Sequence, residues 1–300
     1  MSYERLVGFG TRKVTDEIIK PFVISGRGRW FNPILPEGKN AVDKYELTNW
    51  YGYNHSKWIY NKPETVVFGI LRGAEKILWN CKRLGIDYYY FDHAYFFKAH
   101  NHKPNTQIGH RIYRITKNNE SLNYITKLEQ EDRNRIKKYK HKLPDITNNR
   151  IGRKILVATP TAAVGRFYKI ESLKSWKLDL IEKLKEYTDR EVIFRDKDTR
   201  TPLQEDLDQA HTVITLQSAV GIQAHIRGIP VICEDYSMCK PISIDYNDIE
   251  KDYKLDYDLT TDWIDSLLAN QFIEIEIRNG LAKRTIDRLQ NVNTTRIDLK

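Results

Sequence analysis

The amino-acid sequence predicts an α/β protein with two lobes, each built on a parallel β-sheet that helices cover. The chain has 300 residues, which is the length of two ordinary domains. Short apolar runs typical of buried strands alternate with segments of helical spacing in residues 65–97 and again in 151–236. The stretch KLPDITNNR (142–150) separates the two series and is the best linker candidate. We therefore expect lobes at 1–150 and 151–261, followed by helices at 262–300.

The first lobe contains one clear β-α-β unit. TVVFGIL (65–71) is typical of a buried strand, and RGAEKILWNCKRLG (72–85) has the apolar spacing of a helix that ends at Gly85. IDYYYFD (86–92) follows as a second strand. Residues 1–62 are aromatic and interrupted by glycine and proline, so they predict no element, and 98–142 is expected to form loops and a helix.

The second lobe alternates regularly between the two kinds of element. Strands are expected at KILVATP (154–160), EVIFRDK (191–197), TVITLQ (212–217) and IPVICE (229–234). Helices are expected at 172–188, 202–210 and 218–228, and a helical tail at 262–289 breaks at Asn279-Gly280. This order predicts a doubly wound parallel sheet with helices on both faces.

Three loops leave the carboxyl ends of these strands, where ligands bind in open parallel sheets: 159–167, 195–202 and 216–221. Hydroxyl groups, free backbone N–H groups and cations in such loops form an anion site, which favours a bound phosphate. The alternative is structural, because Ser218 is also a good helix cap and a glycine allows close packing. No GxGxxG follows the first strand and no GxxxxGK[ST] is present, which argues against dinucleotide and P-loop sites. The predicted contacts are Thr161, Gly165, Arg166, Arg195, Lys197, Gln217 and Ser218.

The charge of the chain is concentrated in one segment. The net charge is +9, and residues 98–142 hold twelve basic and four acidic residues, a local net charge of +8. Aromatic side chains among cations hold unstacked bases and phosphates, so this segment predicts contact with a polyanion. The alternative is a solvated, charged helix. The predicted contacts are His110, Arg111, Tyr113, Arg114, Lys137, Lys138 and Lys140.

The segment EVIFRDKDTRTPLQEDLDQAHTVITLQSAVGIQAHIRGIPVICED (191–235) resembles the nucleotide-sugar-binding half of the GT-B glycosyltransferases, particularly relatives that build capsules and sialylated glycans. The resemblance covers 151–236 well and 65–97 loosely. It implies two Rossmann-like lobes, a nucleotide-sugar donor in the second lobe, and C-terminal helices that cross back to the first lobe. Two positions depart from the family pattern. Asp196-Lys197 stands at the His-Pro position, and Gln223 stands where an acidic residue often holds the donor ribose.

The resemblance implies transfer of a sugar, of hexosyl or pentosyl type, to an acceptor hydroxyl. Such a transfer with inversion needs a base for the hydroxyl proton. Asp92 follows the second strand of the first lobe, and we expect it to be this base, with His93 as its substitute or orienter. The alternative is a turn-forming Asp and a structural His. A metal is not implied, because His100, His102 and His110 are too loosely spaced.

The acceptor we expect is hydroxymethylpyrimidine in bacteriophage DNA, held by the basic segment 98–142. Two alternatives remain open: a cell-envelope glycan reached at an anionic membrane, and a non-catalytic nucleic-acid-binding protein on a transferase-like fold. The sequence contains no apolar run that could span a bilayer and no secretory signal, so we expect a cytoplasmic protein, in the host cell if it is encoded by a phage.

Overall fold

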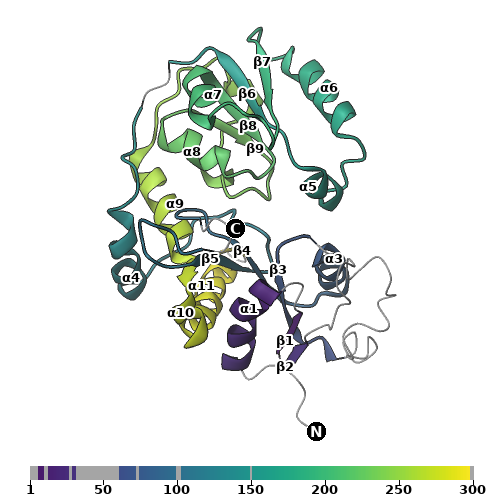
Figure 1. The fold of residues 1–300 in the computed structure, drawn as a ribbon. Coiled ribbons are helices and arrows are strands. Elements are labelled where there is room, and N and C mark those ends of the chain that lie inside the picture. Colours follow the sequence, from purple (N-terminus) through teal and green to yellow (C-terminus); the bar gives the residue numbers. More distant parts are fainter. Residues whose placement is uncertain are drawn as a thin grey trace. The chain divides into compact units, whose positions relative to one another are not determined.

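The computed structural model describes residues 6–9, 13–26, 29–31, 61–71, 74–98, 103–148 and 151–297, whose elements are drawn in Figure 1. The chain divides into two compact units. Unit 1 contains Met1–Glu120, Lys127–Tyr139 and Leu268–Lys300, and unit 2 contains Ser121–Thr126 and Lys140–Leu267. The α/β class with parallel strands and covering helices is confirmed, whereas the GT-B type of the fold stays a prediction.

Unit 1 is built on a six-stranded sheet of order β10-β5-β4-β3-β1-β2. Four of its strands run parallel to one another: β1 (Leu6–Phe9), β2 (Arg29–Phe31), β3 (Glu64–Phe68) and β4 (Tyr88–His93). β5 (Ile112–Lys117) pairs antiparallel with β4, and β10 (Gln271–Ile273) pairs antiparallel with β5. The sheet is therefore mixed at the edge that carries β5 and β10.

The predicted β-α-β unit is confirmed as β3, α3 (Ala74–Leu84) and β4, and α3 is followed by Gly85, whose φ is +62°. β5 corrects the expectation of only loops and a helix at 98–142, although α4 (Gln130–Lys140) does form there. Arg114 and Lys117 interrupt the apolar pattern by which β5 could have been predicted. Their charges are paired with Asp92 and with Glu64 inside the unit, so they occupy sheet positions that the sequence suggests are solvated.

Among the described residues, α1 (Lys13–Ser25), α10 (Glu274–Arg278) and α11 (Leu281–Ile297) pack on one face of the unit 1 sheet. The predicted break at Asn279-Gly280 separates α10 from α11, and Gly280 has a φ of +77° that favours glycine. β10 corrects the expectation of an all-helical tail. The helices and strands share one apolar core, which includes Ile18, Ile19, Phe22, Val66, Tyr89, Phe91, Tyr113, Ile115, Phe272, Ile277 and Ile286.

Unit 2 is built on a four-stranded parallel sheet of order β7-β6-β8-β9. The strands are β6 (Lys154–Ala158), β7 (Val192–Arg195), β8 (Ala210–Thr215) and β9 (Val231–Cys233). The helices are α5 (Ala162–Phe167), α6 (Leu173–Leu184), α7 (Leu203–Gln209), α8 (Val220–Ile226) and α9 (Tyr257–Ala269), with short 3-10 turns at Lys240–Ile242 and Tyr246–Asp248. The predicted doubly wound series is confirmed strand by strand.

The unit 2 sheet is buried on both faces, as continuous apolar strands require. Ile155, Val157 and Ile214 pack with Leu180 and Leu184 of α6 on one face. Successive side chains of a strand point to opposite faces, so the buried Leu156 and Val213 lie on the other face, where α7 and α8 contact the sheet.

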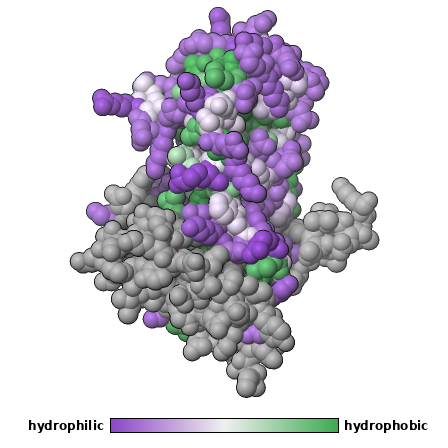
Figure 2. Space-filling model, turned by 90° about the vertical axis from the view of Figure 1, so that its right-hand side faces the viewer, coloured by the Kyte–Doolittle hydropathy of each residue, from purple (hydrophilic) through white to green (hydrophobic). Residues whose placement is uncertain are grey.

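The surface of the described residues is mainly hydrophilic on the face that Figure 2 shows, with smaller hydrophobic areas. The large exposed hydrophobic residues of the described part of the chain come from several segments of both units: Ile24, Leu71, Trp79, Ile151, Leu178, Tyr257, Leu259 and Ile275. None of the helices in the described part of the chain combines the length and apolar character needed to span a bilayer.

A buried histidine joins α8 to α9 in unit 2. The Nε2 atom of His225 lies 2.9 Å from the Thr260 hydroxyl, and its Nδ1 atom lies 3.3 Å from the Tyr253 hydroxyl. Its ring packs edge-on against Trp263 with a centroid distance of 5.2 Å. Burial lowers the pKa of His225 to about 4, because the charged imidazolium would lose its hydration.

We expect His225 to make unit 2 less stable in mild acid. Below about pH 6.5 the unfolded chain protonates this side chain, whereas the folded chain does not until about pH 4, so stability is lost as the pH falls through this window. The loss between pH 8 and pH 5 is about 2 kcal/mol. Urea unfolding at both pH values should show that His225→Gln removes this difference, and the exposed His110→Gln is the matched control. An unchanged difference in His225→Gln would contradict the assignment.

Candidate functional site

The carboxyl edge of the unit 2 sheet contains a topological switch point. The chain passes from β6 to β7 on one side and then returns to β8 on the other side, so the loops after β6 and β8 leave neighbouring strands in opposite directions. Ligands of open α/β sheets bind at this point, beyond the carboxyl ends of the strands. Ala158 pairs with Thr215 in the register of β6 and β8, so both loops begin at the same level.

The loop after β6 places three predicted residues in different roles. The hydroxyl of Thr161 caps α5 and accepts a hydrogen bond from the backbone N–H of Val164 at 3.4 Å. Gly165 is buried, and a Cβ there would lie 3.2 Å from the side chain of Leu173, so this glycine allows close packing. Arg166 is exposed on α5 and is the cation that this loop offers.

The loop after β8 is held by its own side chains. Ser218 donates its backbone N–H to the Thr215 hydroxyl at 2.8 Å, and its own hydroxyl accepts from the N–H of Val220 at 3.2 Å. A Cβ on Gly221 would lie 2.8 Å from the sulfur of Cys239, so this glycine brings α8 close to its neighbour. Gln223 is exposed on α8. Ser218 therefore stabilises the turn through these two hydrogen bonds.

Gln217 lies at the centre of a cluster that the sequence does not reveal. Its side-chain carbonyl accepts hydrogen bonds from the hydroxyls of Tyr168 at 2.9 Å and Ser121 at 3.2 Å. Tyr168 stacks on Tyr236, with ring centroids 3.9 Å apart and ring planes within 6°. Tyr168 follows α5 and Tyr236 follows β9, so their positions at the ends of elements in this lobe could have indicated that they join the cluster. Ser121 comes from the remote segment Ser121–Thr126, and no local pattern indicates it.

The loop after β7 is fastened by Arg195. Its guanidinium pairs with Asp206 and donates to the backbone carbonyl of Thr201 at 2.8 Å. Asp196 pairs with Lys177 at 2.9 Å, and this hydrogen bond lowers the pKa of Asp196. Lys197 is exposed in this loop. Arg195 thus shapes the loop, and Lys197 is the predicted residue whose charge faces solvent.

In unit 1, Asp92 and His93 lie at the carboxyl end of β4, as predicted. One oxygen of Asp92 accepts hydrogen bonds from Arg114 at 2.8 Å and from the Tyr90 hydroxyl at 2.9 Å, and the other accepts from the His93 backbone N–H at 2.7 Å. Burial would raise the pKa of Asp92, but the Arg114 guanidinium and these hydrogen bonds hold it below its usual value. Arg114 also lies over the Tyr95 ring at 4.9 Å.

This arrangement makes Asp92 a firmly ionised but weakly basic carboxylate, because each hydrogen bond that stabilises the charged form lowers its affinity for a proton. The imidazole of His93 lies next in the chain, and its ring packs edge-on against Phe68 with a centroid distance of 6.1 Å. The choice of Asp92 as a base, with His93 as its substitute or orienter, stays a prediction.

The residues predicted to contact a polyanion lie on two elements. His110, Arg111, Tyr113 and Arg114 belong to β5 or the loop before it, and Lys137, Lys138 and Lys140 belong to α4. Several of these cations are paired: Arg111 with Glu274, Lys138 with Glu276 at 3.6 Å, and Lys140 with Asp265 at 2.7 Å. Tyr113 is fully buried, and burial raises its pKa to about 12. Much of the positive charge of segment 98–142 is thus balanced within the units.

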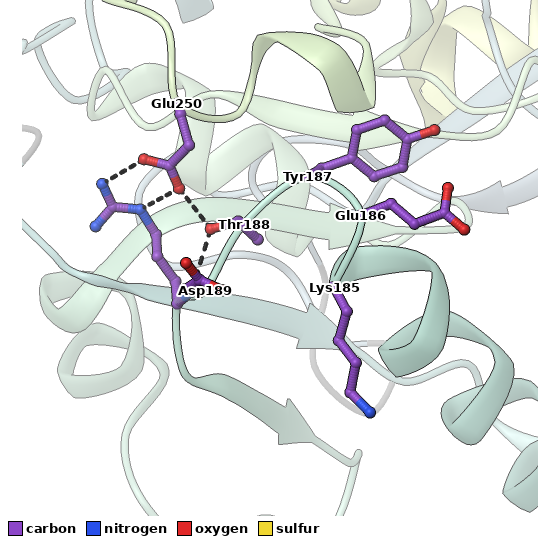
Figure 3. Close-up of a pocket in the computed structure, with 7 residues that line it drawn as sticks. Lys185, Glu186, Tyr187, Thr188, Asp189 and Glu250 are labelled. Atoms are coloured by element: carbon purple, nitrogen blue, oxygen red, sulfur yellow. Dashed lines mark hydrogen bonds and ion pairs between the residues drawn. The ribbon is translucent and has the colours of Figure 1, made fainter.

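A pocket of about 610 Å³ lies elsewhere in unit 2, beside the segment that leads into β7 (Figure 3). Arg190 makes two hydrogen bonds of 2.9 Å to Glu250, and the Thr188 hydroxyl donates to the same carboxylate. Because this segment precedes β7, the pocket belongs to the amino edge of the sheet, away from the switch point. The pocket is lined by Lys185, Glu186, Tyr187, Thr188, Asp189, Arg190 and Glu250. None of these is a predicted site residue.

Among the described residues, no group of three or more His, Cys, Asp or Glu side chains is arranged to hold a metal ion. His100 and His102 lie outside the described residues.

Comparisons with known proteins give similarity to solved structures. No family model matches this sequence, and no curated protein matches it. The β-Kdo 2,7 transferase of KpsC from Thermosulfurimonas dismutans is 15% identical, with a TM-score of 0.47, and the match covers 93% of this chain and 99% of that chain. The β-Kdo 2,4 transferase of KpsC from the same organism is 10% identical, with a TM-score of 0.45, and covers 94% of this chain and 99% of that chain.

Proposed function

We propose that this protein is a glycosyltransferase that takes a sugar from a nucleotide-sugar donor. The observation that carries the proposal is the switch point between β6 and β8, where hydroxyl, amide and cationic side chains follow the carboxyl ends of parallel strands. The resemblance of residues 191–235 to the donor-binding half of the GT-B glycosyltransferases supports a nucleotide sugar as the ligand.

The residues of the three loops and of α8 have different proposed roles in donor binding. Lys197 and Arg166, both exposed after β7 and β6, supply positive charge for the diphosphate. The side-chain amide of Gln217, in the loop after β8, supplies a neutral donor. Arg195 keeps the loop after β7 in shape through Asp206 and Thr201, and Gln223 lies on α8 as the residue proposed to meet the ribose.

We expect the protein to bind a nucleoside diphosphate through Lys197. Lys197→Ala should weaken binding by roughly 1 to 3 kcal/mol, because a charge-assisted hydrogen bond to phosphate is removed. Calorimetry with UDP, CDP, GDP and dTDP, and with CMP, measures this. Lys185→Ala, a lysine at the opposite edge of the unit 2 sheet, is the matched control. The donor site would be elsewhere if both variants bound nucleotide like the wild type, and the proposed function would fail if no nucleotide bound the wild-type protein.

Transfer with inversion requires a group that accepts the proton of the acceptor hydroxyl while its oxygen bonds to the anomeric carbon and the nucleotide leaves with its bonding electrons. We propose that the Asp92 and His93 pair at the end of β4 does this. Because Arg114, Tyr90 and the His93 N–H already engage the Asp92 carboxylate, the two residues must be separated by experiment.

His93→Gln and Asp92→Asn should differ in both stability and turnover. Asp92→Asn leaves the buried Arg114 without a counter-charge and should cost about 3 to 5 kcal/mol of unfolding free energy, whereas His93→Gln leaves that ion pair intact. Loss of the base should lower turnover by about 10² to 10⁴-fold. Transfer rate and urea stability are measured on the same preparations, with nucleotide affinity as the control. If His93→Gln is stable and fully active while the folded fraction of Asp92→Asn is inactive, the base is Asp92. If the folded fraction of Asp92→Asn is also active, the base lies outside this pair.

We propose DNA with hydroxymethylated pyrimidines as the acceptor, as the basic segment 98–142 suggests. The alternative acceptor is a cell-envelope glycan beside an anionic membrane. The ion pairs of Arg111, Lys138 and Lys140 reduce the free charge of this segment, so the salt dependence of binding is the informative quantity.

Replacing Lys137, Lys138, Lys140 and Lys142 together with Ala should flatten the slope of log affinity against log salt for duplex DNA by up to roughly 3 to 4 units, about 0.9 for each phosphate that the protein no longer neutralises. The change is smaller where Lys138 and Lys140 stay paired with Glu276 and Asp265 in the wild type. Fluorescence anisotropy at several salt concentrations measures the slope. Lys174→Ala with Lys185→Ala, two exposed lysines of unit 2, is the control. An unchanged slope would mean that α4 is only a solvated helix. A steeper dependence of log affinity on log salt for anionic vesicles than for DNA would favour the acceptor at a membrane.

A further inference from the structure

Five residues of unit 2 form what we call the orienting cluster: Ser121, Asn123, Tyr168, Gln217 and Tyr236. We propose that Ser121 and Tyr168 are positioning residues that turn the Gln217 side chain so that it offers only N–H donors to the ligand. Gln217 then selects an oxygen acceptor, which we assign to the phosphates of the donor. This inference rests on the proposed function, because it concerns the same donor site.

The Gln217 side chain lies with its carbonyl oxygen, rather than its amide nitrogen, toward the hydroxyls of Tyr168 and Ser121. A side-chain carbonyl has two lone pairs, and here one receives the Tyr168 hydroxyl at 2.9 Å and the other receives the Ser121 hydroxyl at 3.2 Å. The amide nitrogen makes no hydrogen bond within the described part of the chain. Its two N–H groups are therefore left to a ligand at the switch point, and they suit phosphate oxygens.

The position of the Tyr168 hydroxyl is itself held by stacking. Tyr168 and Tyr236 lie face to face with centroids 3.9 Å apart, and both rings are partly buried. Because the stack restrains the position of the Tyr168 ring, its hydroxyl oxygen stays within hydrogen-bond distance of the Gln217 carbonyl. The aromatic pair thus connects the end of α5 and the loop after β9 to the loop after β8.

The segment Ser121–Thr126 supplies the other half of the cluster. Ser121 is fully buried at 0% exposure, and the Asn123 amide donates to the backbone carbonyl of Asp235 at 2.8 Å, next to Tyr236. The backbone N–H of Thr126 donates to the Ser266 hydroxyl at 2.9 Å, which anchors the far end of the segment. One short segment therefore fixes both the Gln217 carbonyl and the loop that carries Tyr236.

The test combines the introduction of a negative charge with a double-mutant cycle. Gln217→Glu keeps the size of the side chain and still accepts from both hydroxyls, but it presents a negative oxygen to the phosphates. It should weaken binding of a nucleoside diphosphate by at least about tenfold while changing binding of the uncharged nucleoside by less than about threefold. Gln130→Glu, an exposed glutamine of α4, is the matched control and should bind like the wild type.

The cycle separates positioning from a merely structural role. Tyr168→Phe keeps the stacked ring and removes the hydroxyl, so it should weaken diphosphate binding several-fold in the wild type but not in a Gln217→Ala background. An equal effect in both backgrounds, or full affinity in Gln217→Glu, would overturn the inference while leaving nucleotide binding intact. Failure of the wild-type protein to bind any nucleotide is a different result, because it overturns the proposed function and this inference with it.

Discussion

The parallel pairing of β6 with β8 is the interaction on which the rest of unit 2 depends. It places Ala158 beside Thr215, so the chain leaves both strands at the same level and in opposite directions. The buried residues Ile155, Val157 and Ile214 secure this register, because a slip by one residue would turn each of them to the other face of the sheet. The apolar core of the sheet thereby sets the positions of Thr161, Gln217 and Ser218, none of which contributes to that core.

In unit 1, charged residues as well as apolar ones are buried within the sheet. Arg114 lies within β5 at 7% exposure and is tolerated there because Asp92, on the neighbouring strand β4, neutralises it and aromatic rings surround it. Lys117 occupies the end of β5 beside Glu64 and Asp287. A segment with a net charge of +8 by sequence therefore contributes the second strand from one edge of the sheet, and its local charge in the sequence overstates the charge that it presents to solvent.

The sequence predicts the elements whose pattern is local. β3, α3 and β4, and the whole series from β6 to β9, follow from apolar periodicity and from stops such as Gly85. β5 and β10 escape prediction because their strand character depends on partners elsewhere: Asp92 and Glu64 for the charges of β5, and β5 itself for β10. The orienting cluster escapes for the same reason, since Ser121 and Gln217 are separated by 96 positions in the chain.

Several side chains that the sequence suggests for ligand binding are engaged in stabilising their own loops. The loops after β6, β7 and β8 and the end of β4 stay a predicted site, and in the structure Arg195 is engaged by Asp206 and Thr201, Ser218 by its own turn, and Asp92 by Arg114. A loop that must hold a ligand first needs a fixed shape, and polar side chains at its base are the groups that provide it. The groups that we propose for ligand binding, such as the Lys197 ammonium and the amide nitrogen of Gln217, make no such contacts among the described residues. Because the second of these is neutral and held by hydroxyls, the selectivity of the proposed site depends on hydrogen-bond direction as well as on charge.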